Sequence, residues 1–318
     1  MPLLEIRDLK IYYEYQGRTL KAVDGVSLTL DKGEILGIVG ESGSGKSTLG
    51  LAIGRLLPSN AKIVGGEIIF NGIDLVKASS KTISKLRGKD IAYVFQDPHN
   101  SLNPTMKVGY QSGEVLKYHL MIKNKRSIFH RVIEAFKLGR IPDAERRFYS
   151  YPHELSGGMK QRVVISTATL TSPKLIVADE PTSALDVTIQ RQLINLFSDL
   201  KERFETSIML ITHDIGVVAE LADKVAVMYA GKIVEFGNVY KVLEDPQHPY
   251  TQLLLESVPK VSSSGVVLKS IPGFIPDLAN PPSGCRFHPR CPLADEECSI
   301  KDPGFRLVKD RYVACIKR

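Results

Sequence analysis

The feature that most constrains this chain is a glycine-rich octapeptide, Gly40-Glu41-Ser42-Gly43-Ser44-Gly45-Lys46-Ser47. It follows residues 35–39, a short continuous apolar run of the kind expected for a strand buried on both faces. It also fits the pattern G-x-x-x-x-G-K-S/T, in which glycines let backbone N–H groups approach phosphates at the start of a helix. The sequence therefore predicts a strand, a phosphate loop and a helix that starts at Lys46.

The phosphate loop supplies a set of candidate ATP ligands with distinct roles. We expect the Lys46 ammonium to reach the β- and γ-phosphates and the Ser47 hydroxyl to bind Mg²⁺. The expected ATP-binding residues of the loop are Gly40, Ser42, Gly43, Ser44, Gly45, Lys46, Ser47 and Thr48.

Polar residues at the ends of other predicted strands are candidates for hydrolysis. Asp179 ends an apolar run, where a P-loop fold places a metal-binding carboxylate. Glu180 follows it and can accept a proton from an attacking water. Gln96 and His213 also follow predicted strands, so Gln96 can bind metal or water and His213 can sense the γ-phosphate. We therefore expect catalytic roles for Glu180, His213 and Gln96, and Mg²⁺ coordination by Ser47, Gln96 and Asp179.

The order of predicted elements indicates an α/β fold. Residues 1–31 alternate apolar and polar positions, as strands do, with a turn expected at 18–21. Residues 65–72 are predicted to be a strand that ends in an Asn-Gly turn. Residues 91–95 are predicted to be a buried strand. Helical spacing occupies roughly 107–147. Helices and strands then alternate, as parallel strands with crossover helices do, at 157–170, 175–179, 187–203, 207–211, 214–222 and 224–229.

Length and composition set further limits. The chain has 318 residues, 43% of them hydrophobic, so it can hold one large and one small domain or two of medium size. No apolar run reaches the length of a membrane span, and the N-terminus lacks the basic region and apolar core of a secretory signal. We therefore expect a cytosolic chain, in which disulfides are uncommon.

The net charge of +7 is concentrated in one stretch. Residues 107–147 contain ten Lys or Arg against four Asp or Glu. Such charges suit a solvated helical face, or a surface near anionic lipid headgroups. Nucleic acid is disfavoured as a partner, because no pattern of interleaved aromatic residues accompanies the charges.

Between the two halves of the nucleotide site lies Leu155-Ser156-Gly157-Gly158-Met159-Lys160-Gln161-Arg162. This element resembles the signature of ATP-binding cassette (ABC) proteins, and the resemblance covers about residues 1–255. It implies a P-loop ABC ATPase with a mixed sheet core, an antiparallel β subdomain and a helical subdomain at about 97–172. It also implies ATP hydrolysis coupled to transport, with two cassettes closing head to tail around each ATP.

The motifs of the ABC family map onto individual residues of this chain. Gln96 corresponds to the Q-loop glutamine, His213 to the switch histidine and residues 183–186 to the D-loop. The adenine-stacking aromatic maps to Tyr13, with Tyr15 as the alternative. The residues implied to contact the partner's ATP are Ser156, Gly157, Gly158, Gln161 and Asp186.

Further segments resemble the dipeptide, oligopeptide and nickel importer branch. They are residues 96–104, 179–188, 246–251, 271–273 and 284–292. We therefore expect a nucleotide-binding domain at 1–255 and the branch's C-terminal extension at 256–318. The resemblance implies a place on the cytoplasmic face of the membrane, a second, non-identical ATPase, two permeases and an extracytoplasmic binding protein. Peptides, oligosaccharides and nickel are the implied cargoes.

A soluble ABC ATPase of DNA repair or translation is the alternative. Coiled-coil repair ATPases separate their two nucleotide motifs by long coiled coils, and the short interval between Ser47 and Asp179 disfavours this class. Ribosome-recycling cassettes carry two cassettes in tandem and an N-terminal cysteine module, whereas this chain has one cassette and a C-terminal tail.

All four cysteines, Cys285, Cys291, Cys298 and Cys315, lie in the tail. Their spacing contains no C-x2-C pair of the kind usual in zinc ribbons, and a cytosolic chain disfavours disulfides. Four thiolates can hold an iron–sulfur cluster. The resemblance of the tail to this importer branch implies such a cluster. We expect a [4Fe–4S] cluster, with zinc, disulfides or free thiols as alternatives.

Overall fold

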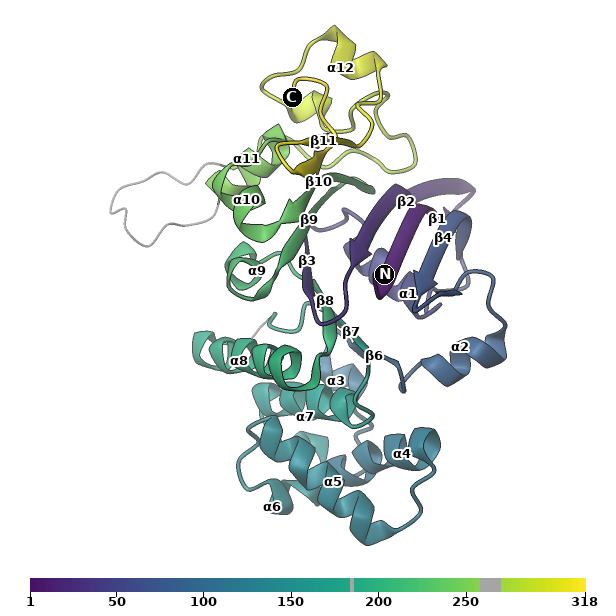
Figure 1. The fold of residues 1–318 in the computed structure, drawn as a ribbon, viewed down its shortest axis with the longest axis vertical. Coiled ribbons are helices and arrows are strands. Elements are labelled where there is room, and N and C mark those ends of the chain that lie inside the picture. The colour runs from purple at the N-terminus through teal and green to yellow at the C-terminus, as the bar shows by residue number, and fades with distance from the viewer. Residues whose placement is uncertain (184–185, 258–269) are drawn as a thin grey trace. The chain divides into compact units, whose positions relative to one another are not determined.

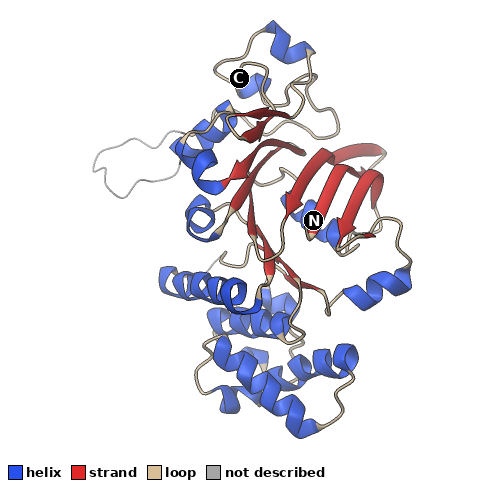
Figure 2. Ribbon diagram, in the orientation of Figure 1, coloured by secondary structure: helices blue, strands red, loops and turns tan. Residues whose placement is uncertain are grey.

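The computed structural model describes residues 1–183, 186–257 and 270–318, which form two compact units (Figure 1). The first unit contains Met1–Asp31, Ile35–Lys77 and Ile211–Arg318. The second unit contains Lys32–Glu34 and Ala78–Leu210. Most of the strands belong to the first unit and most of the helices to the second (Figure 2).

The first unit begins with an antiparallel sheet in the order β2-β1-β4-β5. Its strands are β1 (Leu4–Tyr15), β2 (Arg18–Leu30), β4 (Ala61–Phe70) and β5 (Ile73–Asp74). The predicted apolar positions Leu4, Ile6, Leu9 and Ile11 are all buried. The pairing register shifts between Ile6 and Leu9, and such a bulge lets even-numbered and odd-numbered residues share one buried face.

The turn expected at residues 18–21 is wrong. Arg18 already pairs with Tyr15, and the turn consists of Gln16 and Gly17, with φ of 49° and 73°. Two residues with positive φ match the right-handed twist of a hairpin, so Gly17 was the signal for the turn. The turn predicted at Asn71 and Gly72 is confirmed, with φ of 47° and 81°.

The remaining strands of the first unit follow the order β11-β12-β10-β9-β3. β3 (Ile35–Val39) is buried at every position, as predicted, and pairs in parallel with β9 (Lys224–Tyr229). β10 (Lys232–Asn238) pairs antiparallel with β9 and with β12 (Arg311–Val313), and β11 (Arg306–Val308) completes the edge. The chain beyond residue 300 therefore adds strands to β10.

Short helices accompany these strands. The helix α1 (Lys46–Ile53) starts at Lys46 as predicted, and α9 (Ile215–Leu221) matches the expected helix at 214–222. The others are α10 (Val239–Glu244), α11 (Pro249–Glu256), the 3₁₀ turn η2 (His288–Arg290) and α12 (Glu296–Ile300).

The second unit holds the strands β8 (Ser207–Ile211), β7 (Leu175–Asp179) and β6 (Ile91–Val94) in that order, with β6 and β7 parallel. All three strands were predicted. Two helices near them also match their predicted bounds within a residue, namely α7 (Gly157–Thr169) and α8 (Val187–Phe204). The shorter elements are α2 (Ser80–Leu86), α3 (Pro98–Ser101) and the 3₁₀ turn η1 (Pro152–Glu154).

The helical stretch predicted at 107–147 consists of three helices, α4 (Val108–Leu120), α5 (Lys125–Leu138) and α6 (Ala144–Phe148). Met121 ends α4 in the left-handed conformation, and Asn124 begins α5 by accepting hydrogen bonds from two backbone N–H groups. In the described ranges, no helix has the length and apolar character needed to cross a membrane.

Candidate functional site

The phosphate loop lies between β3 and α1 in the first unit. Lys46 is buried, and its ammonium donates hydrogen bonds to the backbone oxygens of Gly40, at 2.8 Å, and Glu41, at 2.9 Å. Gly45 precedes the helix with a φ of 102°. The lysine is thus held over the loop by the loop's own carbonyl groups.

Three glycines give the loop its shape. A Cβ at Gly40 would lie 2.0 Å from the Met228 oxygen, and one at Gly45 would lie 2.1 Å from the Ala22 oxygen. A Cβ at Gly43 would meet open space. The buried Ser44 hydroxyl has no hydrogen-bond partner among the described residues. A concave backbone with an unsatisfied donor fits a bound phosphate chain.

Two further predicted ATP residues lie in the same unit. The Tyr13 hydroxyl is 3.1 Å from the Thr48 Oγ1 at the start of α1, so β1 reaches the helix that carries the loop. The alternative aromatic, Tyr15, is 57% exposed. His213 is exposed in the segment between β8 and α9.

The predicted hydrolytic residues Asp179 and Glu180 lie at the end of β7 in the second unit. Asp179 is the last residue of the strand, as expected. Glu180 has a φ of 49°, a left-handed conformation that is uncommon outside glycine, and its carbonyl accepts hydrogen bonds from the backbone and side chain of Ser183. Gln96 is exposed just beyond β6 in the same unit.

The signature forms the start of α7. Ser156 caps the helix by accepting a hydrogen bond of 3.3 Å from the Met159 N–H, and Ser156 and Gly157 are exposed. A Cβ at Gly158 would come within 2.9 Å of Ile189 on α8. A Cβ at Gly157 would meet open space, so the helix presents its N-terminal backbone dipole at a surface that is open at Gly157 and close to α8 at Gly158.

The other residues expected to contact a partner's ATP differ in exposure. Gln161 is buried, and neither atom of its side-chain amide has a hydrogen-bond partner among the described residues. Asp186 is exposed and caps α8 by accepting a hydrogen bond of 2.9 Å from Ile189. Ala184 and Leu185 of the expected D-loop lie outside the described residues.

The four cysteines line one small cavity in the first unit together with His248 and Phe287. All four are free thiols, so the disulfide alternative is not observed. Burial, with smaller contributions from the neighbouring thiols, raises the pKa of Cys285 to about 11. Across the described parts of the chain, no group of three or more His, Cys, Asp or Glu is arranged to hold a metal ion. The four thiols line one cavity, but they are not arranged as a set of ligands for a metal ion.

A histidine that the sequence did not single out also lines the cysteine cavity. His248 Nδ1 accepts a hydrogen bond of 3.0 Å from the Tyr250 N–H. Burial lowers the pKa of His248 to about 3, so the ring is neutral and its proton lies on Nε2. The backbone of Ala314 opposes this pKa shift, yet Nε2 has no partner with hydrogen-bond geometry in the described structure. The wall of the cavity therefore includes a buried, neutral imidazole that lies beside the Ala314 backbone.

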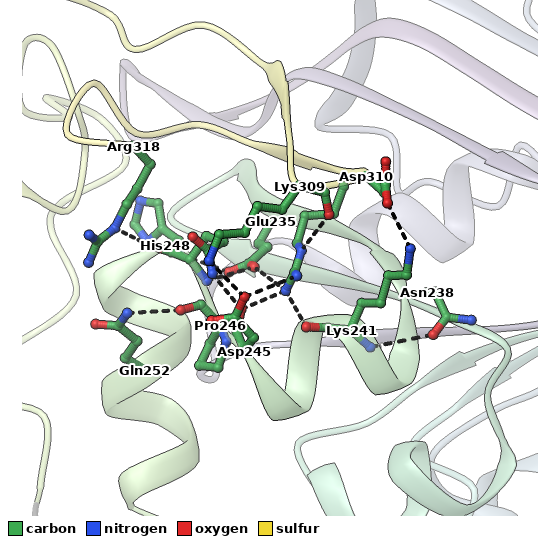
Figure 3. A network of polar contacts seen from close by, with 12 residues as sticks. Glu235, Asn238, Lys241, Asp245, Pro246, His248, Gln252, Lys309, Asp310 and Arg318 are labelled. Carbon is green, nitrogen blue, oxygen red and sulfur yellow. Dashed lines mark hydrogen bonds and ion pairs between the residues drawn. The ribbon is translucent and has the colours of Figure 1, made fainter.

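A buried carboxylate on β10 fixes the segment that carries His248 (Figure 3). Glu235 accepts hydrogen bonds from the backbone N–H groups of Gln247 and His248, both 2.9 Å long. Burial raises the pKa of Glu235 above its usual value. The guanidinium of Arg311 on β12 lies 3.9 Å from the same carboxylate. Strand β12 thus helps to position the wall of the cysteine cavity.

The sequence also missed a contact between the tail and the phosphate loop. Arg290, in the 3₁₀ turn before Cys291, forms two hydrogen bonds with the carboxylate of Glu41. Glu41 occupies a variable position of the loop pattern, so nothing in the motif marked it. Only the fold brings residues so distant in sequence together.

Comparisons with known proteins give the family. Residues 23–183 match the ABC transporter family, and residues 234–298 match the oligopeptide/dipeptide transporter C-terminal region. The oligopeptide transport ATP-binding protein OppD of Bacillus subtilis is 51% identical over 98% of this chain and 87% of that protein. The dipeptide transport ATP-binding protein DppD of Bacillus subtilis is 45% identical over 98% of this chain and 92% of that protein.

Solved structures agree with the sequence relatives. A dimeric, post-hydrolysis structure of the ATP-binding cassette MJ0796, bound to ADP and Pi, has a TM-score of 0.68 and 26% identity. It covers 74% of this chain and 98% of its own. The protein cbiO1 from Clostridium perfringens, part of the ABC transporter complex cbiONQ, has a TM-score of 0.65 and 30% identity, covering 77% of this chain and 91% of its own. The chain belongs to the ABC transporter family, as an ATP-hydrolysing subunit with the C-terminal region of oligopeptide and dipeptide transporters.

Proposed function

We propose that this chain hydrolyses ATP on the cytoplasmic face of a membrane to power the import of oligopeptides or dipeptides. The observation that carries the proposal is one chain with both a complete phosphate loop and an oligopeptide/dipeptide transporter C-terminal region. The names of the relatives, which describe oligopeptide and dipeptide transport, favour peptides over oligosaccharides or nickel.

The residues of the phosphate loop bind the triphosphate in this proposal. Lys46 and the backbone N–H groups hold the phosphates, Ser47, Asp179 and Gln96 hold Mg²⁺, and Tyr13 stacks on the adenine. Bound Mg²⁺ supplies charge neutralisation at the phosphates. Lys46 must leave the carbonyl groups of Gly40 and Glu41 to reach an ATP phosphate, which is a small movement of one flexible side chain.

Glu180 accepts the proton of the attacking water, and His213 contacts the γ-phosphate. The left-handed backbone of Glu180 supports this role, because uncommon backbone conformations in ordered segments cluster at functional sites. Ser156, Gly157, Gly158, Gln161 and Asp186 act on the ATP of a partner subunit. The exposure of Ser156 and Gly157 at the N-terminus of α7 supports that assignment.

The proposed partners are a second, non-identical ATPase, two membrane permeases and an extracytoplasmic binding protein. We also propose that residues 1–255 form the nucleotide-binding domain, with a helical subdomain at about 97–172, and that residues 256–318 form the extension. Purification of the chain with its bound membrane proteins would identify these partners directly.

Reconstitution tests the transport proposal. Proteoliposomes that contain this chain, its permeases and its partner ATPase should accumulate a labelled peptide only when ATP and the binding protein are present. A Lys46→Ala variant of this chain should abolish or strongly reduce uptake. Accumulation of Ni²⁺ or an oligosaccharide without peptide uptake would replace the proposed cargo.

A single substitution tests the hydrolytic assignment. Glu180→Gln should retain ATP binding but lower turnover by about 10²-fold, as for the loss of a general base. Glu114→Gln, an exposed substitution on α4, is the matched control and should hydrolyse ATP normally. Steady-state phosphate release and nucleotide titration measure the two quantities. Near-normal turnover of the Glu180→Gln protein would exclude the assignment.

We further propose that the four cysteines hold one [4Fe–4S] cluster, with zinc as the alternative. Four free thiols lining one cavity are the donor set that such a cluster needs.

Anaerobic purification tests the cluster. The protein should be brown and contain about four irons per chain. Replacing Cys298 with Ser should remove the colour while the phosphate loop still binds ATP. Colourless protein with one zinc per chain would establish the alternative.

A further inference from the structure

Arg290 connects the C-terminal extension to the phosphate loop through Glu41. Its Nη1 lies 2.8 Å from Glu41 Oε2 and its Nη2 lies 3.1 Å from Glu41 Oε1, a bidentate pair. The Arg290 side chain is only 5% exposed and that of Glu41 is 28% exposed. A planar guanidinium that engages both oxygens of a carboxylate fixes its orientation as well as its charge.

The surroundings of Arg290 hold the guanidinium in place. Its Nε donates a hydrogen bond of 2.7 Å to the Pro272 oxygen, and the guanidinium lies 5.7 Å from the centre of the Tyr229 ring. Tyr229 is itself fully buried on β9. The arginine is therefore rigidly positioned before it meets Glu41, so it can act as a fixed anchor for the loop.

The backbone N–H, the backbone oxygen and the carboxylate of Glu41 all form hydrogen bonds. Its N–H donates a hydrogen bond of 3.0 Å to the Tyr250 hydroxyl on α11. Its backbone oxygen accepts hydrogen bonds from the Lys46 ammonium and from the Ser44 N–H, the latter 3.2 Å long. Its carboxylate is bound by Arg290. One residue of the loop thus joins the phosphate-binding lysine to two groups from the C-terminal part of the chain.

The charge of Glu41 makes this arrangement functionally significant. A carboxylate in a loop that receives a polyanion repels that polyanion, more strongly where water is partly excluded. Arg290 supplies the counter-charge of the carboxylate and fixes its orientation. We propose that Arg290 is a positioning residue for ATP binding, which acts through Glu41 to keep the phosphate loop in shape and free of uncompensated negative charge.

The proposal makes a specific prediction about paired substitutions. Arg290→Gln should weaken Mg²⁺-ATP binding by about tenfold, because a partly buried carboxylate loses its counter-charge. Glu41→Gln should bind ATP within about threefold of the unmodified protein, because the repulsive charge is gone. The double variant should bind like Glu41→Gln alone. If Arg290→Gln weakened ATP binding only by loosening the extension, adding Glu41→Gln in the phosphate loop would not restore ATP binding.

Two further variants separate this role from a general loss of stability. Arg311→Gln removes an equally buried arginine of the extension, which binds the backbone oxygen of Asp245 and not the phosphate loop. It should lower the melting temperature without weakening ATP binding. Glu41→Asp keeps the charge but shortens the reach to Arg290, so it should bind ATP more weakly than Glu41→Gln.

The experiment is a titration of the full-length purified chain with a fluorescent ATP analogue and Mg²⁺, with a thermal melt of each variant. In the assembled transporter, Arg290→Gln should raise the KM for ATP while kcat changes by less than about twofold. The proposal is overturned if the double variant binds as weakly as Arg290→Gln, or if Arg311→Gln weakens binding equally. If Arg290→Gln fails to fold, the two Glu41 variants decide. The proposal is then overturned if the Glu41→Asp protein binds ATP as tightly as the Glu41→Gln protein.

Discussion

At the scale of single residues, the phosphate loop depends on glycines for two different physical reasons. Gly43 needs only a positive φ, whereas Gly45 combines a φ of 102° with close approach to the Ala22 oxygen. The motif identified both glycines without separating these reasons. It could not identify Glu41 or Arg290, because the loop pattern leaves position 41 open and the partner is distant in sequence.

Substitution of the two glycines by alanine should therefore have unequal effects. Gly43→Ala should destabilise the fold by about 1 kcal/mol, the cost of a non-glycine residue in the left-handed region. Gly45→Ala adds a collision with the Ala22 backbone, for a total of about 2–4 kcal/mol. Denaturant titration without nucleotide measures both. Equal destabilisation would show that the β2 backbone can move away from the loop at little cost.

At the scale of elements, the sequence predicted best where one local rule decides the structure. The buried run of β3, the Asn-Gly turn and the alternation of β7, α8, β8, α9 and β9 were all found from local patterns. The turn between β1 and β2 was predicted at the polar residues 18–21, whereas the two-residue pair Gln16-Gly17 forms it. The strands β11 and β12 were missed, because strands this short are defined by pairing with β10 and not by periodicity.

Three basic residues in the loop after α4 and in the first turn of α5 test whether this region lies near a membrane surface. Lys123, Lys125 and Arg126 are exposed. Reversing all three charges should weaken association with anionic vesicles or membranes, since each basic residue near such a surface contributes about 1 kcal/mol. ATP affinity should not change.

The matched control reverses three exposed lysines elsewhere, Lys62, Lys81 and Lys85. Co-sedimentation with membranes at physiological salt, alongside nucleotide titration, distinguishes the two triple variants. If both bind membranes as the unmodified chain does, the stretch at 107–147 is simply a solvated helical face.

At the scale of the whole molecule, the sequence motifs identified the family, while the structure supplied links between segments. The tail contacts the rest of the first unit through β12 on β10, through Arg311 beside Glu235 and through Arg290 on the phosphate loop. The cysteine cavity is lined by residues between 248 and 317. One of them, Cys291, directly follows Arg290, the residue that binds the phosphate loop. Such long-range contacts depend on tertiary packing, which local sequence rules do not encode.

The exposed start of α7 leads to a prediction about assembly. The N-terminal N–H groups of a helix attract an anion, and here Ser156 and Gly157 are exposed at that end. If they serve the ATP of a second cassette, the isolated chain should hydrolyse ATP slowly and the assembled transporter quickly. Ser156→Ala in this chain should lower hydrolysis in the assembly by about tenfold or more, as when one donor to a transition state is lost.

The same substitution also removes a helix cap, which by itself costs about 1 kcal/mol. Asn124→Ala removes the corresponding cap of α5 and is the matched control, expected to leave hydrolysis unchanged. Pairing Ser156→Ala with Lys46→Ala, placed in this chain or at the equivalent lysine of the partner ATPase, identifies the affected site. If Ser156 serves the partner's nucleotide, Ser156→Ala should still reduce the remaining activity when the phosphate loop of this chain is inactive. It should have little effect when the partner's phosphate loop is inactive. The reverse pattern, or rapid hydrolysis by a strictly monomeric preparation, would show that the signature acts within its own chain.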